Sequence, residues 1–178
     1  GGVVVVRPPL GSPLTPQDNT IVGNTVLYGA TAGKLFASGR AGERFCVRNS
    51  GASVVVEGCG SNGCEYMTGG VAVILGSVGD NFGAGMTGGM AFVYDADGEF
   101  MKRMNPDTLT AQGLESAHWE GVLEELVEAH AAATGSPLAS RLLRDWDVER
   151  GKFLQICPKE MLTRLSHPLS DKAEAATA

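Results

Sequence analysis

The sequence contains four cysteines and three histidines, the residue types that most often bind zinc or iron–sulfur clusters. These residues are Cys46, Cys59, Cys64, Cys157, His118, His130 and His167. Zinc ribbons and redox dithiols use C-x-x-C pairs, and the sequence has no such pair. The histidines also lie far from the cysteines along the chain. We therefore expect free, buried thiols and no metal site within this chain.

Two glycine-rich segments, residues 58–63 and residues 83–88, have the spacing G-x-G-x-x-G. In dinucleotide-binding folds this motif lies between a strand and a helix, and the N-terminus of that helix holds the pyrophosphate. Only residues 64–70 separate the first segment from the next apolar run, and the second segment leads into another apolar run directly. No crossover helix fits in either place, so we expect no dinucleotide site.

Two further groups of residues could form binding sites. Residues 29–34 approach a P-loop, but three residues separate the glycines where four are needed, and Leu35 stands where Ser or Thr would hold magnesium. A possible binding cluster consists of Arg44, Arg48, Asp80 and Asn81. Such residues also cap the backbone of turns or form solvated edges, which we favour here. No nucleophile–base pair is present, so we expect no catalytic, cofactor-binding or metal-binding residue.

A repeat within residues 52–94 predicts the strands and corners that carry these residues. The sequence M-T-G-G occurs at residues 67–70 and again at residues 86–89, a step of 19 residues, and an apolar run follows each copy. An apolar run followed by glycines is typical of a strand and a corner. Nineteen extended residues span roughly 60 Å, which suits one three-sided turn of a coil. The repeat therefore predicts a parallel β-helix, in which equivalent strands stack in parallel.

Other strands are expected at residues 3–6, 20–28 and 44–48, and a last one at residues 100–104. The prolines that follow Val6 take the chain out of the sheet, because proline cannot donate into a strand ladder. Gly1 and Gly2 resemble the Gly-Gly corner of the repeat. We therefore expect a β-helix over residues 1–104 that is truncated at its N-terminal end.

A helical period begins near Ser116. Apolar residues then recur at helical spacing: Trp119, Val122, Leu123, Leu126 and Val127. Gly135 is placed as a C-cap, and Ser136 with Pro137 as the N-cap and first residue of a second helix. Residues 152–157 are expected to be extended and residues 159–165 to form a short helix. We expect a helical extension over residues 105–165, packed on the β-helix, and a frayed tail over residues 166–178.

The composition limits the partners. The formal net charge is −6 with no basic stripe, which argues against nucleic acid. The apolar runs are far shorter than a membrane span, and no charged leader with an apolar core precedes them. We therefore expect a soluble, cytoplasmic protein with no membrane and no nucleic-acid partner.

Several motifs in the same order resemble the C-terminal domain of the glutamate synthase large subunit. They include N-T-I-V-G-N-T at residues 19–25, V-R-N-S-G-A at residues 47–52 and G-C-E-Y-M-T-G-G at residues 63–70. One departure is Ser61 and Asn62, where the family has Asp and His. The resemblance covers nearly the whole chain. It implies an all-β, right-handed parallel β-helix, a single-stranded solenoid followed by a short α-helical C-terminal segment.

The resemblance also implies the reaction of a parent enzyme. An N-terminal cysteine hydrolyses L-glutamine, and ammonia travels internally to a flavin domain. There it adds to 2-oxoglutarate, and the product is reduced to L-glutamate with electrons ultimately from NADPH or ferredoxin. The implied cofactors are FMN and an iron–sulfur cluster in the upstream domains, with FAD and NADPH on a small flavoprotein subunit. The holoenzyme is expected to be a homo-oligomer.

In that family this domain carries none of the catalytic groups, so the chain alone is expected to be inactive. The implied role is structural: it holds the upstream glutaminase and FMN synthase domains of the same subunit in register. An alternative is a stand-alone glycine-repeat β-helix subunit of another oxidoreductase complex, such as formylmethanofuran dehydrogenase.

Overall fold

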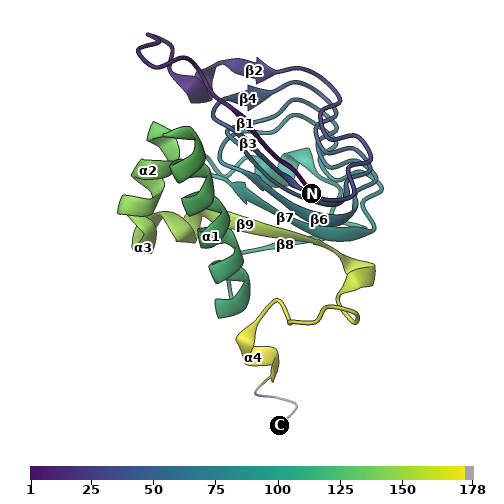
Figure 1. Cartoon of the computed structure of the whole chain (residues 1–178). Coiled ribbons are helices and arrows are strands. Elements are labelled where there is room, and N and C mark those ends of the chain that lie inside the picture. Colours follow the sequence, from purple (N-terminus) through teal and green to yellow (C-terminus); the bar gives the residue numbers. More distant parts are fainter. Residues whose placement is uncertain (175–178) are drawn as a thin grey trace.

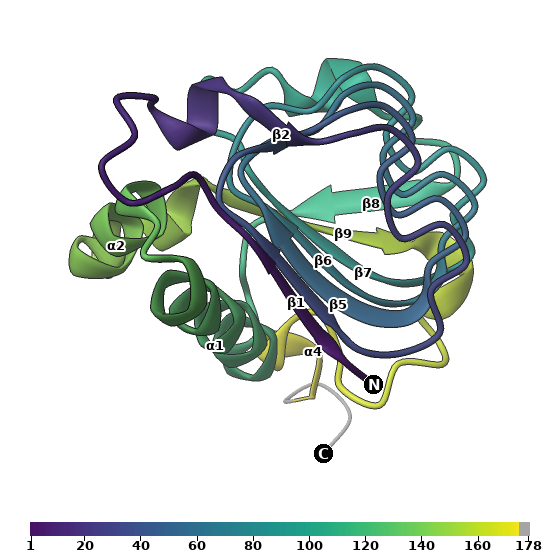
Figure 2. The ribbon, with the colours of Figure 1, turned by 45° about the horizontal axis from the view of Figure 1, so that its top comes forward.

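The computed structural model describes residues 1–174 and consists of a β-solenoid with helices packed against one side (Figure 1). Five parallel strands stack in sequence order along the coil. They are β1 (Val3–Val6), β3 (Lys34–Ala37), β5 (Ser50–Val56), β6 (Thr68–Ile74) and β7 (Gly88–Tyr94). The chain therefore makes four turns between β1 and β7. Figure 2 shows the successive coils lying over one another. The predicted parallel β-helix is confirmed.

The length of each turn follows from the strand register. Lys34 pairs with Ser53 and Val71 with Met90, steps of 19 residues, whereas Val54 pairs with Ala72, a step of 18. At the corner before β7 the register slips by one residue, so Gly88 pairs with Thr68 and not with Gly69. The first turn is longer, with Val3 paired to Lys34, because the proline-rich segment after β1 makes an excursion from the coil.

The strands predicted at residues 20–28 and 44–48 are wrong for most of their length. In the first range only β2 (Thr20–Val22) forms, after the 3₁₀ turn η1 (Pro16–Asp18), and no residue of 44–48 is in a strand. β2 pairs in parallel with β4 (Arg40–Ala41), which lies between the two predicted ranges. The chain then bends through alternate residues with positive φ; in one coil these are Arg44, Cys46 and Arg48, with φ of 58°, 61° and 56°.

This alternation points the backbone amide and carbonyl groups of the bend toward the neighbouring coils, where they form hydrogen bonds. The Arg44 amide donates to Ser61 O at 2.9 Å, and the Cys64 amide donates to Phe45 O at 2.7 Å. Left-handed backbone is uncommon for residues with a Cβ, and here the hydrogen bonds between coils hold it in place. A short apolar run cannot distinguish such a bend from a buried strand, because both bury consecutive apolar side chains, here Phe45, Cys46 and Val47.

The end of the solenoid also differs from the prediction. Residues predicted as a last strand form the 3₁₀ turn η2 (Phe100–Arg103), which buries Phe100. Two antiparallel strands, β8 (Leu109–Gln112) and β9 (Phe153–Pro158), continue the sheet in the order β7-β9-β8. The edge of β7 is therefore paired, which removes a template for aggregation. The predicted extended segment at 152–157 is confirmed as β9.

The first long helix ends, and the second begins, where the capping residues predict. The helices are α1 (Ala117–Thr134), α2 (Pro137–Arg144), α3 (Trp146–Glu149) and α4 (Asp171–Glu174), with the 3₁₀ turns η3 (Arg150–Lys152) and η4 (Lys159–Met161). Gly135 has φ 69° and ends α1, and the Ser136 side chain accepts the Ala139 amide at the start of α2. The helix predicted at 159–165 is reduced to η4.

The main sheet is buried on both faces. One face, with Val54 and Val56, lines the interior of the coil, and the other, with Phe36, Val55 and Val73, packs against the helices. The apolar stripe of α1, including Leu123 and Val127, lies on this outer face. Double burial explains the continuous valine run of β5, since a strand with one solvated face would alternate apolar and polar residues. The valines of β1, at the edge of the sheet, are the exception, because Val3, Val4 and Val5 are exposed.

Part of the predicted frayed tail is docked. Leu169 is 7% exposed, and its carbonyl accepts a hydrogen bond from Gln112 Nε2 at 3.1 Å. The Asp171 carboxylate accepts the Ala117 amide at 2.9 Å, at the N-terminus of α1. Residues 169–171 therefore belong to the folded body, and residues 175–178 lie outside the described residues.

Stacking of the coils accounts for the repeated glycines. A Cβ atom on Gly69 would overlap the carbonyl oxygen of Ser50, and one on Gly88 would overlap that of Thr68. Neither overlap involves a flexible side chain that could move away. These glycines are required because the next coil passes at strand spacing, about 4.8 Å.

We predict that Gly69→Ala lowers the free energy of unfolding by about 1–3 kcal/mol, because backbone of two coils must separate. Gly121→Ala is the matched control: Gly121 lies in α1 with open space around its Cβ position, and alanine there should stabilise by about 0.5–1 kcal/mol. Urea unfolding followed by circular dichroism measures both. Equal stability of Gly69→Ala and the wild type would contradict the packing explanation.

Candidate functional site

The carboxyl ends of the parallel strands meet at one edge of the solenoid, next to the helices. The register of β3, β5, β6 and β7 places four residues of successive coils in line, immediately at or after the strand ends. We call this the edge column; it consists of Ser38, Glu57, Leu75 and Tyr94. Two of its members, Glu57 and Tyr94, bind polar groups from the helical segment.

Glu57 joins the solenoid to both long helices. Its side chain is 0% exposed. One carboxylate oxygen, Oε1, lies 3.2 Å from His130 Nε2 on α1 and accepts hydrogen bonds from the hydroxyls of Ser38, at 3.2 Å, and Ser136. Ser136 is also the N-cap of α2. We call these four residues the Glu57 cluster.

The Glu57 cluster combines serine, histidine and carboxylate, but its geometry suits attachment and not nucleophilic catalysis. Ser136 and His130 both contact Glu57 Oε1, whereas an activated serine needs its hydroxyl on the histidine. Ser136 and His130 are also fully buried. Sequence reasoning overlooked this cluster; its one signal was a carboxylate directly after the valines of a buried strand.

A second cluster fixes α2 and α3 to the end of β7. The Tyr94 hydroxyl donates to Glu149, and Lys152 Nζ lies 3.0 Å and Arg141 Nη1 3.4 Å from the same carboxylate. Hydrogen bonds from Tyr94 and Lys152 lower the pKa of Glu149. Burial and the neighbouring Glu149 raise the pKa of Tyr94, so the phenol remains a proton donor.

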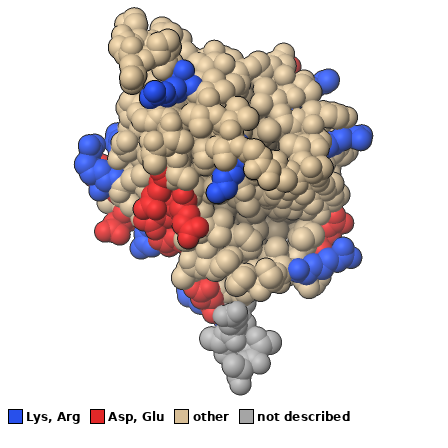
Figure 3. All heavy atoms as spheres, in the orientation of Figure 1, with Lys and Arg blue, Asp and Glu red and all other residues tan. Residues whose placement is uncertain are grey.

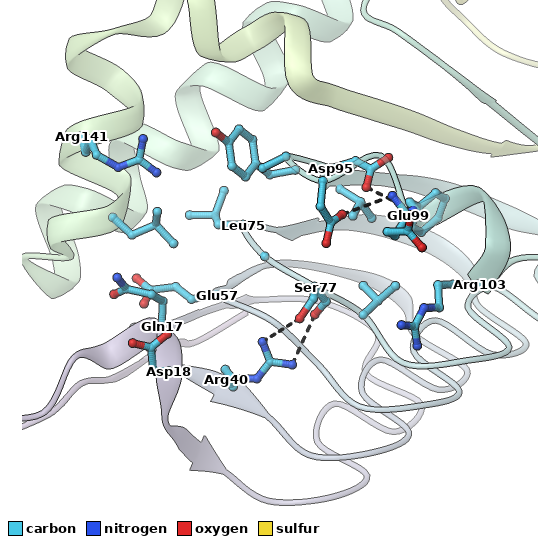
Figure 4. Close-up of a pocket in the computed structure, with 18 residues that line it drawn as sticks. Gln17, Asp18, Arg40, Glu57, Leu75, Ser77, Asp95, Glu99, Arg103 and Arg141 are labelled. Carbon is cyan, nitrogen blue, oxygen red and sulfur yellow. Dashed lines mark hydrogen bonds between the residues drawn. The ribbon is translucent and has the colours of Figure 1, made fainter.

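A pocket of about 450 Å³ lies along the edge column, between the solenoid corners and α2 (Figure 4). We call it the edge pocket. Its charged lining residues are Asp18, Glu57, Asp95, Asp97, Glu99, Arg40, Arg103 and Arg141. Arg40 donates to the Ser77 hydroxyl at 3.0 Å, across neighbouring corners. The volume of the edge pocket suits a small ligand or one long side chain.

The coil brings three of the four cysteines into one interior cluster, Cys46, Cys59 and Cys64, while Cys157 lies under the helices. All four thiols are free and buried, as predicted. Burial raises the pKa of Cys46 and of Cys59, and it raises the pKa of Cys157 to about 11. Within the described part of the chain, no group of three or more His, Cys, Asp or Glu side chains is arranged to hold a metal ion.

The other two histidines, His118 and His167, contact each other and a neighbouring tryptophan. The rings of His118 and His167 stack at 3.5 Å, near the start of α1 and the docked tail. The Trp119 indole donates to the His167 carbonyl at 3.2 Å. These contacts add to the attachment of the segment before α4.

The glycine motifs face neighbouring coils and not a ligand. After Gly63 the chain forms a bend and then β6, with no helix. A Cβ on Gly63 would crowd Cys59 Sγ and the Phe82 ring, and one on Gly60 would crowd Glu43. The space that a phosphate would need at these glycines is occupied by the protein itself.

The four residues weighed as a binding cluster from the sequence, Arg44, Arg48, Asp80 and Asn81, make separate contacts. Asp80 pairs with Arg103 at 3.0 Å, and Arg48 lies over the Tyr66 ring at 5.9 Å. Arg44 and Asn81 occupy equivalent bend positions two coils apart, both with φ 58°.

The departure at Ser61 and Asn62 leaves the corner intact. The Ser61 hydroxyl accepts the Asp80 amide at 3.2 Å, as an aspartate could. Asn62 adopts φ 62°, a conformation that asparagine tolerates well.

Acidic side chains gather over α1 on one face of the molecule, with lysines and arginines scattered around them (Figure 3). That face has no basic stripe of the kind that nucleic acid requires. None of the helices described within residues 1–174 is both long enough and apolar enough to cross a bilayer.

We predict that Glu57→Ala destabilises the fold by about 3 kcal/mol or more, because it leaves buried donors of three residues without an acceptor. Glu128→Ala, on the exposed side of α1, is the control and should change stability by about 0.5 kcal/mol or less. Denaturant titrations compare the two. A Glu57→Ala protein as stable as the control would show that the helices are held without the carboxylate.

We also predict that Ellman's reagent at pH 8 leaves the folded chain unmodified over minutes. All four thiols are buried, and the raised pKa values of Cys46, Cys59 and Cys157 further suppress their thiolates. The same chain in guanidinium chloride should release four equivalents of chromophore, one for each free cysteine. A folded-state thiol that reacts as fast as free cysteine would contradict the buried arrangement.

Comparison with known proteins identifies relatives of this architecture. The GXGXG motif family matches residues 1–159. The chain is 62% identical over 169 residues to the glutamate synthase [NADPH] large chain of Azospirillum brasilense, covering 95% of this chain and 11% of that protein. It is 49% identical to the ferredoxin-dependent glutamate synthase 2 of Synechocystis sp., over 89% of this chain and 10% of that protein. For the glutamate synthase [NADH] of Schizosaccharomyces pombe the identity is 46%, over 98% and 8% respectively.

The chain thus spans about a tenth of the length of these curated relatives. The predicted kinship with the glycine-repeat domain of glutamate synthase large chains is confirmed. The matched residues include Gly69 and Gly88, which the stacked coils require. This chain belongs to the GXGXG motif family.

Proposed function

We propose that the chain is the non-catalytic structural domain of a glutamate synthase, and that it holds the upstream glutaminase and FMN synthase domains of the same subunit in register. The proposal rests on the structural role of the buried polar side chains. Ser136, His130 and Glu57, which could in principle do chemistry, are fully buried and join the helices to the solenoid. The relatives at 46–62% identity support the choice of parent enzyme.

The proposed parent reaction makes L-glutamate from L-glutamine and 2-oxoglutarate. FMN and an iron–sulfur cluster would belong to the upstream domains, with FAD and NADPH on a small flavoprotein subunit of a homo-oligomeric, cytoplasmic holoenzyme. Ammonia made at one site must reach the other without escaping, so the two sites need a constant separation. A stack of coils tied together by backbone hydrogen bonds at every corner is suited to keep that separation.

The test uses the complete large subunit carrying Gly69→Ala, with Gly121→Ala as control. Loosening the solenoid should uncouple the two reactions, so that the ammonia released per glutamine hydrolysed rises several-fold while glutaminase activity persists. Gly121→Ala should leave the ratio unchanged. Ammonia and glutamate are measured in the same reaction mixture.

If Gly69→Ala measurably destabilises the domain but leaves the ratio of ammonia released to glutamine hydrolysed unchanged, the domain does not hold the two catalytic domains in register. Equal loss of both activities would also contradict the proposed role, since that result indicates general support of the subunit and no specific alignment.

A further inference from the structure

The edge pocket has an excess of unpaired negative charge. It is lined by five carboxylates and three arginines. Arg103 pairs with Asp80 and Arg141 with Glu149, and among the carboxylates Glu99 pairs with Lys102. Arg40 binds only the neutral Ser77 among residues 1–174. Four carboxylates without a Lys or Arg partner therefore face one arginine without a carboxylate partner.

One of these carboxylates is buried with an acceptor unused. Glu57 Oε1 has three partners, whereas Oε2 has no hydrogen-bond partner among the described residues. The Glu57 side chain is 0% exposed, yet it lines the edge pocket. The carbonyl oxygen of the Gln17 side chain, in the same pocket, is also buried and without a partner. An unsatisfied buried carboxylate oxygen is costly, so such an atom points to a donor supplied from outside the chain.

The remaining acidic groups surround the same space. Figure 4 shows Glu57, Gln17 and Asp18 toward one end of the pocket, and Asp95 and Glu99 toward the other. Burial raises the pKa of Asp95, and the neighbouring Asp97 raises it further. A carboxylate in such surroundings gains from a nearby positive charge.

We propose that the edge pocket binds a guanidinium or primary ammonium group, which donates to Glu57 Oε2 and is neutralised by Asp18 and Asp95. A guanidinium carries five N–H donors in a planar fork and keeps its charge when desolvated. An anion is the poorer ligand, because it would place its charge beside unpaired acceptors with Arg40 alone to balance it.

Two sources can present this chemistry: a free small molecule, or an arginine or lysine side chain from another part of a longer subunit. In either case the bound group bridges the end of β5 and the loop after β7, next to α2. It would therefore complete the attachment that the Glu57 cluster begins.

The test is isothermal titration calorimetry with agmatine, which carries a guanidinium and an ammonium group, on the 178-residue chain after a cooperative thermal melt has shown that it is folded. We expect saturable binding that Glu57→Gln weakens at least tenfold. Asp95→Asn keeps an acceptor for the Phe100 amide and should weaken binding about fivefold to tenfold, comparable to loss of a charged hydrogen bond. Asp107→Asn, an exposed carboxylate that does not line the pocket, should bind as the wild type does.

The complete large subunit separates the two sources. Agmatine that binds the subunit and the chain equally well indicates a small-molecule site, whereas binding by the chain alone indicates that a side chain of the subunit already occupies the pocket. Absence of agmatine binding to both proteins would overturn the proposal, and so would binding that Asp95→Asn and a folded Glu57→Gln leave unchanged. Phosphate binding that Arg40→Gln abolishes would instead assign the pocket to anions.

Discussion

The close approach of successive coils is the constraint from which most of this structure follows. Each turn must return the chain to one strand spacing from the previous turn, and at several corners this leaves no room for a Cβ atom. Glycine is therefore required where backbone meets backbone, as at Gly69 and Gly88. Between the corners some segments form bends in which alternate residues have positive φ, and this geometry lets their peptide groups bond to neighbouring coils.

A sheet made in this way is apolar on its outer face as well as inside, and that face needs a cover. Helices α1 and α2 supply it, with Leu123 and Val127 packed against Val55 and Val73. Apolar packing has little directional preference, so polar contacts at the strand ends set where the helices sit. Glu57, bound to Ser136, and Tyr94, bound to Glu149, provide these contacts, and both Glu57 and Tyr94 line the edge pocket. A buried carboxylate contributes more to the specificity of such an arrangement than to its net stability.

The same edge gathers charged side chains around a recess, the edge pocket. Parallel strands bring their carboxyl ends together, so side chains from coils that are 19 residues apart become neighbours. Ligand sites in sheet proteins often form at this end of parallel strands. Here Arg40 and Ser77, separated by 37 residues, are hydrogen-bonded at the pocket wall.

The sequence alone determined the solenoid, the two long helices with their caps, and the burial of the four cysteines. These features are local or periodic: a 19-residue step, a glycine after a helical stripe, a serine before a proline. Only the tertiary structure decided that residues 44–48 bend and do not form a strand, since the bend depends on hydrogen bonds to other coils. It also decided that β9 pairs with β7 across about sixty residues. The contacts of Glu57 with His130 and Ser136 span more than seventy residues. No periodicity encodes such contacts, because they arise where a strand end and a helix start meet in space.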